Sequence, residues 1–154
     1  MSSGVSTPAS VPCSVRLHLT GGNVIRGHLF LLLDETRPEG IVPVERILNG
    51  QREFIPLGVE GGRSVLLARS SIVTVEVLEA ESEAFLPYPP GGSLDIVTLT
   101  LDSGQELTGL LQSLSPVEAS RTSDVFNDSE RFVILHVEER RILVSKSHIV
   151  HISF

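Results

Sequence analysis

The chain has 154 residues, a formal net charge of −7 and one cysteine, Cys13. A single cysteine excludes an internal disulfide and a cysteine-rich zinc site. The acidic balance argues against a general nucleic-acid binder, because such proteins usually present a basic face. No secretory signal or apolar run of membrane-spanning length is visible, so we expect a cytoplasmic protein without a membrane association. Hydrophobic residues make up 41% and aromatic residues only 5%. The core must therefore be aliphatic, which favours strands.

An internal repeat organises the sequence. The segment 15–29 recurs 82 residues later, at 97–111, with glycines at the same places. The segments around Phe54 and Phe132 correspond at a separation of 78 residues, and 65–72 and 142–149 at a separation of 77. Three blocks in the same order indicate a duplicated unit. The predicted boundaries are a disordered tail over 1–12, a first copy over 13–78, an acidic Pro- and Gly-rich linker over 79–92 and a second copy over 93–154.

Each copy begins with a strand pattern. Apolar and polar residues alternate over 15–19, and a turn signal separates this strand from a longer one over 24–33. Gly27 lies in the middle of that second strand, and Gly109 lies at the same place in the second copy. We interpret both as structural glycines that let a long strand bend, as small barrels require.

A short helical turn follows in each copy, over 43–48 and 123–127. Ser123 is the predicted N-cap of the second. Asn49 and Asn127 follow these turns, where an Asn can end a helix in the left-handed conformation. The other predicted strands cover 53–59, 64–68, 72–77, 96–101, 107–114, 131–137, 141–145 and 149–154. The predicted fold class is therefore all-β, with two tandem five-stranded small barrels of the Sm-like or SH3-like type, each with one short helical turn.

The pattern from Val15 to Leu29 resembles the first motif of Sm and LSm proteins, including the glycine in its second strand. The segments 65–75 and 142–152 resemble the second Sm motif, and 121–132 is similar to a pattern in uncharacterised bacterial small-barrel domains. The resemblance implies RNA binding through a basic residue before the last strand, a position that Arg69 and Lys146 hold. The sequence departs from the family pattern after this basic residue, where Ser70 and Ser147 replace the family's glycine.

No spacing of residues indicates catalysis. The chain has no nucleophile elbow and no phosphate-binding glycine loop, so no enzyme activity, cofactor or metal is predicted. His148 and His151 lie in or beside a strand, where a separation of three points the side chains to opposite faces. We expect a surface or structural role for them. The candidate residues for loops that bind a ligand or partner are Arg69, Lys146, His148, Asn49 and Asn127.

The leading hypothesis is a non-catalytic protein–protein interaction, scaffold or regulatory adaptor protein, because small barrels expose edge strands that can pair with a partner. The alternative is an RNA- or nucleotide-binding Sm-like protein, carried by Arg69 and Lys146. The third and least supported hypothesis is an enzyme that uses a groove between the copies. The candidate edge strands are 64–68 with 72–77 and 141–145 with 149–154, and the last of them, 149–154, is apolar. We expect it to be covered by the first copy, a second chain or another partner. We further expect the copies to pack as a pseudo-symmetric pair, with a remaining edge open to self-association.

Overall fold

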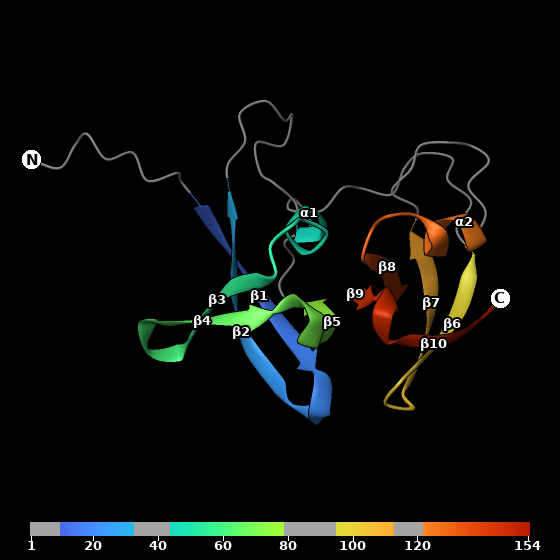
Figure 1. The fold of residues 1–154 in the computed structure, drawn as a ribbon, viewed down its shortest axis with the longest axis horizontal. Coiled ribbons are helices and arrows are strands. Elements are labelled where there is room, and N and C mark those ends of the chain that lie inside the picture. The colour runs from blue at the N-terminus through green and yellow to red at the C-terminus, as the bar shows by residue number, and fades with distance from the viewer. Residues whose placement is uncertain (1–9, 33–43, 79–94, 113–121) are drawn as a thin grey trace, which may run out of the picture.

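The computed structural model describes residues 10–32, 44–78, 95–112 and 122–154, and these residues form an all-β protein (Figure 1). The fold class is thereby confirmed at the level of all-β. These residues include two short α-helices, α1 (Val44–Leu48) and α2 (Thr122–Asn127). The strands of the described residues are β1 (Ser10–Leu19), β2 (Val24–Leu32), β3 (Phe54–Val59), β4 (Arg63–Ala68), β5 (Ile72–Val77), β6 (Ile96–Leu101), β7 (Glu106–Gln112), β8 (Phe132–Val137), β9 (Arg140–Ser145) and β10 (Ile149–Ser153).

The ten strands form one continuous antiparallel sheet in the order β10-β6-β7-β8-β9-β5-β1-β2-β3-β4. We call β1–β5 with α1 the first group and β6–β10 with α2 the second group. The groups lie side by side in Figure 1, and β5 and β9 join them. The sheet is not closed, because β4 and β10 are its two edges. The architecture of two tandem barrels that the sequence predicts is not confirmed, since one open sheet runs through both groups.

The same pairing pattern occurs in both groups. In each, the first strand pairs with the second and with the fifth, and the second pairs with the third and the third with the fourth. Even single pairs correspond: Leu17 lies opposite Val75 in the first group, and Leu99 lies opposite Ile152 in the second. The first hairpin of each group points to the same side of the molecule, away from the helices (Figure 1).

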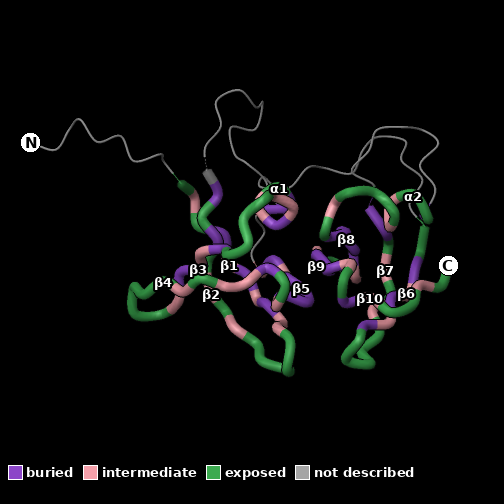
Figure 2. The backbone as a smooth tube through the Cα atoms, viewed as in Figure 1, coloured by how far each residue is buried: buried purple, intermediate pink, exposed green. Residues whose placement is uncertain are grey.

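The core consists of two aliphatic clusters. The cluster in the first group also contains three residues of the second group, Phe132, Ile134 and Leu143. The cluster in the second group includes Val73 of β5. Since side chains alternate across a strand, β8 contributes to both clusters, and the residues of β8 from Phe132 to His136 are all buried. Figure 2 shows this buried backbone around β5, β8 and β9.

Gly27 and Gly109 lie where two strands approach closely. A Cβ atom on Gly27 would overlap the backbone oxygen of Gly58, and one on Gly109 would overlap that of His136. The glycines therefore make room for β3 against β2 and for β8 against β7. Left-handed glycines serve the turns instead: Gly21 has a φ of 84° between β1 and β2.

Several local predictions change. β1 begins at Ser10, so residues 10–12 belong to the sheet. The rest of the predicted tail and the whole linker lie outside the described residues. Ser123 is inside α2 and not its cap. Asn49 and Asn127 are not left-handed, because the one non-glycine residue with positive φ among the described residues is Glu138. Hydrogen bonds of their side chains explain these two asparagines better, as described below.

Candidate functional site

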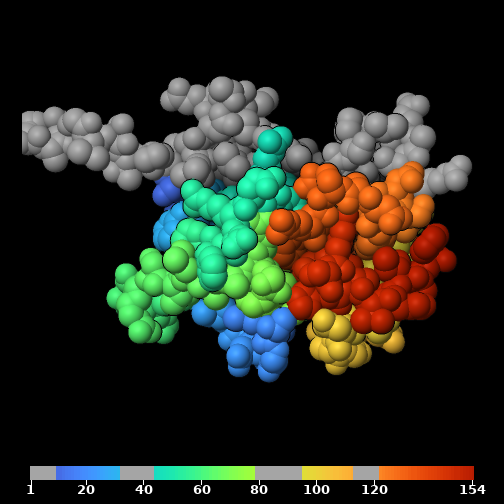
Figure 3. All heavy atoms as spheres, viewed as in Figure 1, coloured from blue at the N-terminus to red at the C-terminus, as the bar shows by residue number. Residues whose placement is uncertain are grey.

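The junction between the two groups is built on a short strand pairing. Thr74, Val75 and Glu76 of β5 lie opposite Val144, Leu143 and Ile142 of β9, respectively. Val75 and Leu143 are fully buried and belong to the same cluster. Figure 3 shows the atoms of the two groups in contact across the middle of the molecule. The pairing therefore combines backbone hydrogen bonds with a continuous apolar core.

A second contact comes from the turn after α1. The Oδ1 atom of Asn49 accepts a hydrogen bond from the backbone N–H of Phe132 at 2.7 Å. This bond satisfies the first N–H of β8, and it positions the Phe132 ring, which is packed in the cluster of the first group. Asn49 thus holds the two groups together. Asn127, the corresponding residue, donates from Nδ2 to the carbonyl oxygen of Ser123 at 2.8 Å and is exposed.

His148 connects three segments at the same junction. It lies in the 3-10 turn Lys146–His148 and is buried. Its Nδ1 lies 2.7 Å from Oδ2 of Asp102, and its Nε2 lies 3.0 Å from the carbonyl oxygen of Ser70. Both partners accept hydrogen bonds, so the geometry suits the doubly protonated imidazolium. Burial lowers the pKa of His148, but the bonds to Ser70 and Asp102 outweigh burial and leave that pKa above its ordinary value of 6.5. The sequence-based expectation of a structural role fits this position, while His151 is exposed.

An ion-pair cluster lies beside the strand pairing. Oε1 of Glu76 is 3.4 Å from Nη1 of Arg140 and 3.5 Å from Nη1 of Arg16. Glu76 and Arg16 belong to the first group and Arg140 to the second, so one carboxylate links both. Such partly exposed pairs contribute little to stability, typically about 0–1 kcal/mol, and the buried apolar contacts dominate the junction.

The basic residues of the RNA-binding hypothesis lie together but are engaged with the protein. Arg69 and Lys146 both line a pocket of about 400 Å³ with Arg131. Arg69 is buried and donates from Nη1 to the carbonyl oxygen of Gly50. Burial lowers its pKa, and the neighbouring Arg131 lowers it further.

The other nitrogens of Arg69, Nε and Nη2, have no hydrogen-bond partner among the described residues and almost no surface accessible to solvent. Lys146 is held by Asp128: its Nζ is 2.5 Å from Oδ1 and 3.3 Å from the carbonyl oxygen. Neither cation is therefore presented freely to an RNA base or phosphate in this structure.

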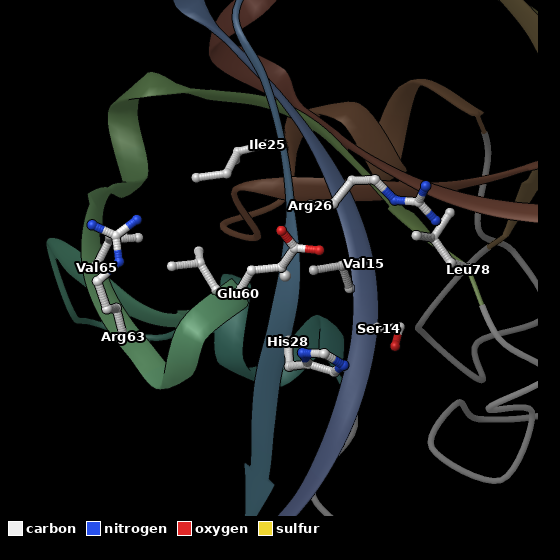
Figure 4. A pocket seen from close by; sticks show the side chains of 11 residues that line it. Ser14, Val15, Ile25, Arg26, His28, Glu60, Arg63, Val65 and Leu78 are labelled. Atoms are coloured by element: carbon white, nitrogen blue, oxygen red, sulfur yellow. The ribbon is translucent and has the colours of Figure 1, made fainter.

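Hollows also lie near both edges of the sheet. One, of about 680 Å³, lies in the first group near β4 and is lined by charged and apolar residues, among them Arg26, Glu60, Arg63 and Val65 (Figure 4). The other, of about 490 Å³, lies between α2 and β10 and is mostly apolar, with Phe126, Ile149, Val150, Ile152 and Phe154 in its lining. We call the second one the β10 pocket.

Large apolar side chains are exposed at both edges of the sheet. Phe54 of β3 and Leu66 of β4 lie at one end, and Val150 and Phe154 lie at the other. Sequence reasoning named 64–68, which contains Leu66, and the terminal strand among the candidate edges, but it did not single out Phe54. Alignment of the repeat pairs Phe54 with Phe132 and Leu66 with Leu143. Phe132 and Leu143 are buried, whereas Phe54 and Leu66 are exposed. The first group pairs with β9 and leaves β10 as an edge, so it is not the cover expected for the terminal strand.

The histidine His136 is buried in β8 and pairs with a side chain of β7. Burial and then Arg141 lower its pKa to about 4, so it is neutral near pH 7. Its Nε2 lies within hydrogen-bond distance of Oε1 of Gln112, and an amide oxygen only accepts, so Nε2 carries the proton. Among the described residues, no group of three or more His, Cys, Asp or Glu side chains is placed to hold a metal ion. In the same part of the chain, no helix has the length and apolar character needed to cross a membrane.

Comparison with known proteins adds no relative. The chain matches no protein-family model, no curated protein and no solved structure.

Proposed function

We propose that the chain is a non-catalytic protein–protein interaction protein, a scaffold or regulatory adaptor built from two Sm-like small β-barrel units. The observation that carries the proposal is the pair of open sheet edges, β4 and β10, each flanked by exposed large apolar side chains. An edge strand offers unpaired backbone N–H and C=O groups to a partner strand. Apolar neighbours add the area that makes such pairing stable.

The duplicated-unit part of the proposal rests on strand pairing. The two groups pair their strands in the same order, and Leu17–Val75 and Leu99–Ile152 are corresponding pairs. Two small units fused through β5 and β9 leave one fourth strand and one fifth strand free. A scaffold needs such a rigid body with two separate attachment points.

Affinity capture tests the proposal. The immobilised full-length chain is incubated with an extract of its native cell, and bound proteins are compared between the parent and the edge variants Leu66→Arg and Val150→Arg. Ile96→Arg is the matched control, because Ile96 is as exposed as Leu66 but lies on the interior strand β6. We expect partners that are lost in one edge variant and kept in the control. Capture that is identical for all four proteins would refute an edge-based interaction function.

No observation favours the RNA- or nucleotide-binding alternative over this proposal. Arg69 is buried against Gly50, and Lys146 is paired with Asp128. A direct RNA-binding test is given in the Discussion.

A further inference from the structure

One stretch of β2 has no strand beside it, although β2 lies in the interior of the strand order. β1 pairs with β2 along the whole of β2. On its other side, β2 pairs with β3 at one position among the described residues, His28 opposite Gly58. Residues 24–27 are therefore unpaired on that side. They form a strand edge that is separate from the two outer edges, β4 and β10.

Glycines explain why β2 and β3 separate there. Gly27 leaves room for the backbone oxygen of Gly58, so β3 approaches β2 closely at this point. β3 ends at the next residue, Val59, and the left-handed glycines Gly61 and Gly62 turn the chain back into β4. The β3–β4 hairpin therefore points in a different direction from the β1–β2 hairpin (Figure 1).

The two hairpins enclose the hollow of about 680 Å³ described above, which we call the β2 groove. This volume falls within the roughly 300–1,000 Å³ of typical ligand sites. Three half-buried aliphatic side chains line the groove and pack against the core of the first group: Ile25, Val59 and Val65. Figure 4 shows Ile25 and Val65 on one side of β2, and Arg26 and Leu78 on the other. The β2 groove thus combines an apolar lining with a free strand edge.

Two arginines of the β2 groove have no ion pair in the described part of the chain. Arg26 of β2 and Arg63 of β4 are both exposed. Arg16, which lies opposite Arg26 on β1, is by contrast paired with Glu76. Glu60 is the one acidic residue among those that line the groove. The groove therefore carries an excess of positive charge, although the whole chain has a net charge of −7.

We propose that the β2 groove binds an extended segment of a partner protein, which adds as a strand beside residues 24–27. The segment directs aliphatic side chains toward Ile25 and Val65 and places an acidic side chain beside Arg26. In such complexes the main-chain hydrogen bonds supply affinity, and the alternate side chains supply specificity. This site is additional to the edges β4 and β10 of the proposed function.

Alternation along β2 determines these two classes of side chain. Ile25 and Arg26 are neighbours, so their side chains lie on opposite faces of the strand. A strand beside β2 alternates in the same way, so every second residue meets Ile25 and the residues between them meet the face of Arg26. Apolar pairs and pairs of opposite charge are the stabilising cross-strand pairs. The four unpaired residues of β2 accommodate about four residues of the segment, or about 13 Å of strand.

The second group lacks the charges of the β2 groove. Thr108 corresponds to Arg26, and Arg140, which corresponds to Arg63, is paired with Glu76 at the junction. The inference therefore assigns the acidic segment to the first group alone.

Titration of the isotopically labelled full-length chain, followed by NMR, tests the inference. The probe is the acetylated and amidated peptide Ser-Glu-Val-Glu-Ile-Glu-Ser-Gly, and the matched peptide has Lys in place of each Glu. We expect the acidic peptide to shift the amide signals of residues 24–28 and 59–65, with a Kd of about 1 mM or lower. The lysine peptide should bind about tenfold more weakly. No shift of these signals at several millimolar peptide, or equal binding of the two peptides, would overturn the proposal.

N-methylated peptides test the backbone pairing. The donors of an added strand face β2 at alternate residues. Methylation of one alternate set of peptide nitrogens should therefore abolish binding, and methylation of the other set should retain it. If both methylated peptides bound like the parent peptide, strand addition would be wrong.

Hydrogen exchange tests whether the edge is free before the peptide binds. Alternate amides of residues 24–27 should exchange quickly in the free chain and about tenfold more slowly or less when the peptide saturates the groove. Slow exchange in the free chain at every concentration would show that the chain's own residues fill the groove. Slow exchange at high protein concentration alone would show that a second copy fills it. Either result would overturn the proposal.

Substitutions at the rim test the charge complementarity. Arg26→Glu and Arg63→Glu should each weaken binding of the acidic peptide about fivefold, and Glu60→Gln should strengthen it. Arg52→Glu is the matched control, because Arg52 is exposed in the same group but does not line the β2 groove. It makes the same change in net charge and should alter the Kd by less than about twofold, because salt screens distant charges. Equal weakening by Arg52→Glu and Arg26→Glu would refute a site at the groove, and circular dichroism shows that each variant is folded.

This inference and the proposed function fail in different ways. A chain that captures partners through Leu66 or Val150 but binds no acidic peptide at β2 would overturn the β2 groove as a site and leave the edge-based function standing. Peptide binding at residues 24–27, together with capture that neither edge variant affects, would support the β2 groove and overturn the function of the outer edges.

Discussion

Replacing Phe132 by Ala should destabilise both groups at once, although Phe132 belongs to the second. The ring is 1% exposed and is packed in the cluster of the first group. A buried aromatic side chain removes roughly 150–250 Å² from water. At about 25 cal/mol per Å², this corresponds to about 4–6 kcal/mol, of which the remaining Ala retains a part. Phe→Ala substitutions in cores typically cost about 3–5 kcal/mol, so we expect a loss of about 4 kcal/mol in the free energy of unfolding.

Urea unfolding of the full-length chain measures this loss. One kcal/mol changes the melting temperature of a chain of this size by roughly 2–4 °C, so the melting temperature should fall by about 8–16 °C. Phe54→Ala is the matched control: it removes the corresponding ring at the free edge, where half of it is already exposed, and should cost about 1 kcal/mol or less. Hydrogen exchange should show faster opening of β1 and β5 in Phe132→Ala. Two separate transitions, of which only the second-group one shifts, would refute the shared core.

Three further predictions follow from the junction and the close strand contacts. Gly109→Ala should lower the free energy of unfolding by roughly 2 kcal/mol or more, because the new Cβ overlaps the His136 backbone oxygen. In the same urea experiment the control Glu106→Ala, exposed on the same strand, should cost little. A Gly109→Ala variant as stable as the parent would contradict the close approach of the two strands. Since the folded-state pKa of His148 is raised, the contribution of His148 to stability is complete below about pH 6.5 and is lost as pH rises through the folded pKa. Urea unfolding from pH 5.5 to 9 should show this loss of stability in the parent and in the His151→Gln control, but not in His148→Gln. Fluorescence polarisation with U-rich and A-rich RNA should show only weak, salt-sensitive binding, and sub-micromolar binding at physiological salt that Arg69→Ala with Lys146→Ala abolishes would restore the RNA hypothesis.

The regular elements were predictable because their signals are local. Alternation over 15–19 and the long second strand with Gly27 appear in the structure as β1 and β2, with ends shifted by a few residues. Helix ends were predicted less well. Ser123 lies inside α2, and Asn49 acts through a hydrogen bond to Phe132, 83 residues away. A sequence window contains no record of such a distant partner, so capping chemistry was the nearest available explanation.

For the candidate site residues, too, the sequence indicated which residues matter, and only the fold decided what they contact. Arg69 and Lys146 were selected as equivalent basic residues, and both do line one pocket. Their hydrogen bonds to Gly50 and Asp128, which decide that they are not free, depend on how the chain folds back on itself. His148 was selected without a partner, and only the folded chain brings it to the carbonyl oxygen of Ser70, 78 residues away.

The sequence alone indicated the strand-rich character, the repeated order of the elements and the places of the two strand glycines, because alternation and turn chemistry act within a few residues. The fold shows that Gly27 and Gly109 make room for a neighbouring strand, where the sequence had suggested a bend. The tertiary structure alone decided that β5 pairs with β9 and that one sheet runs through both groups. Which edges meet and which stay open depends on the three-dimensional path of the chain, and that choice buries Phe132 and Leu143 while it leaves Phe54 and Leu66 exposed.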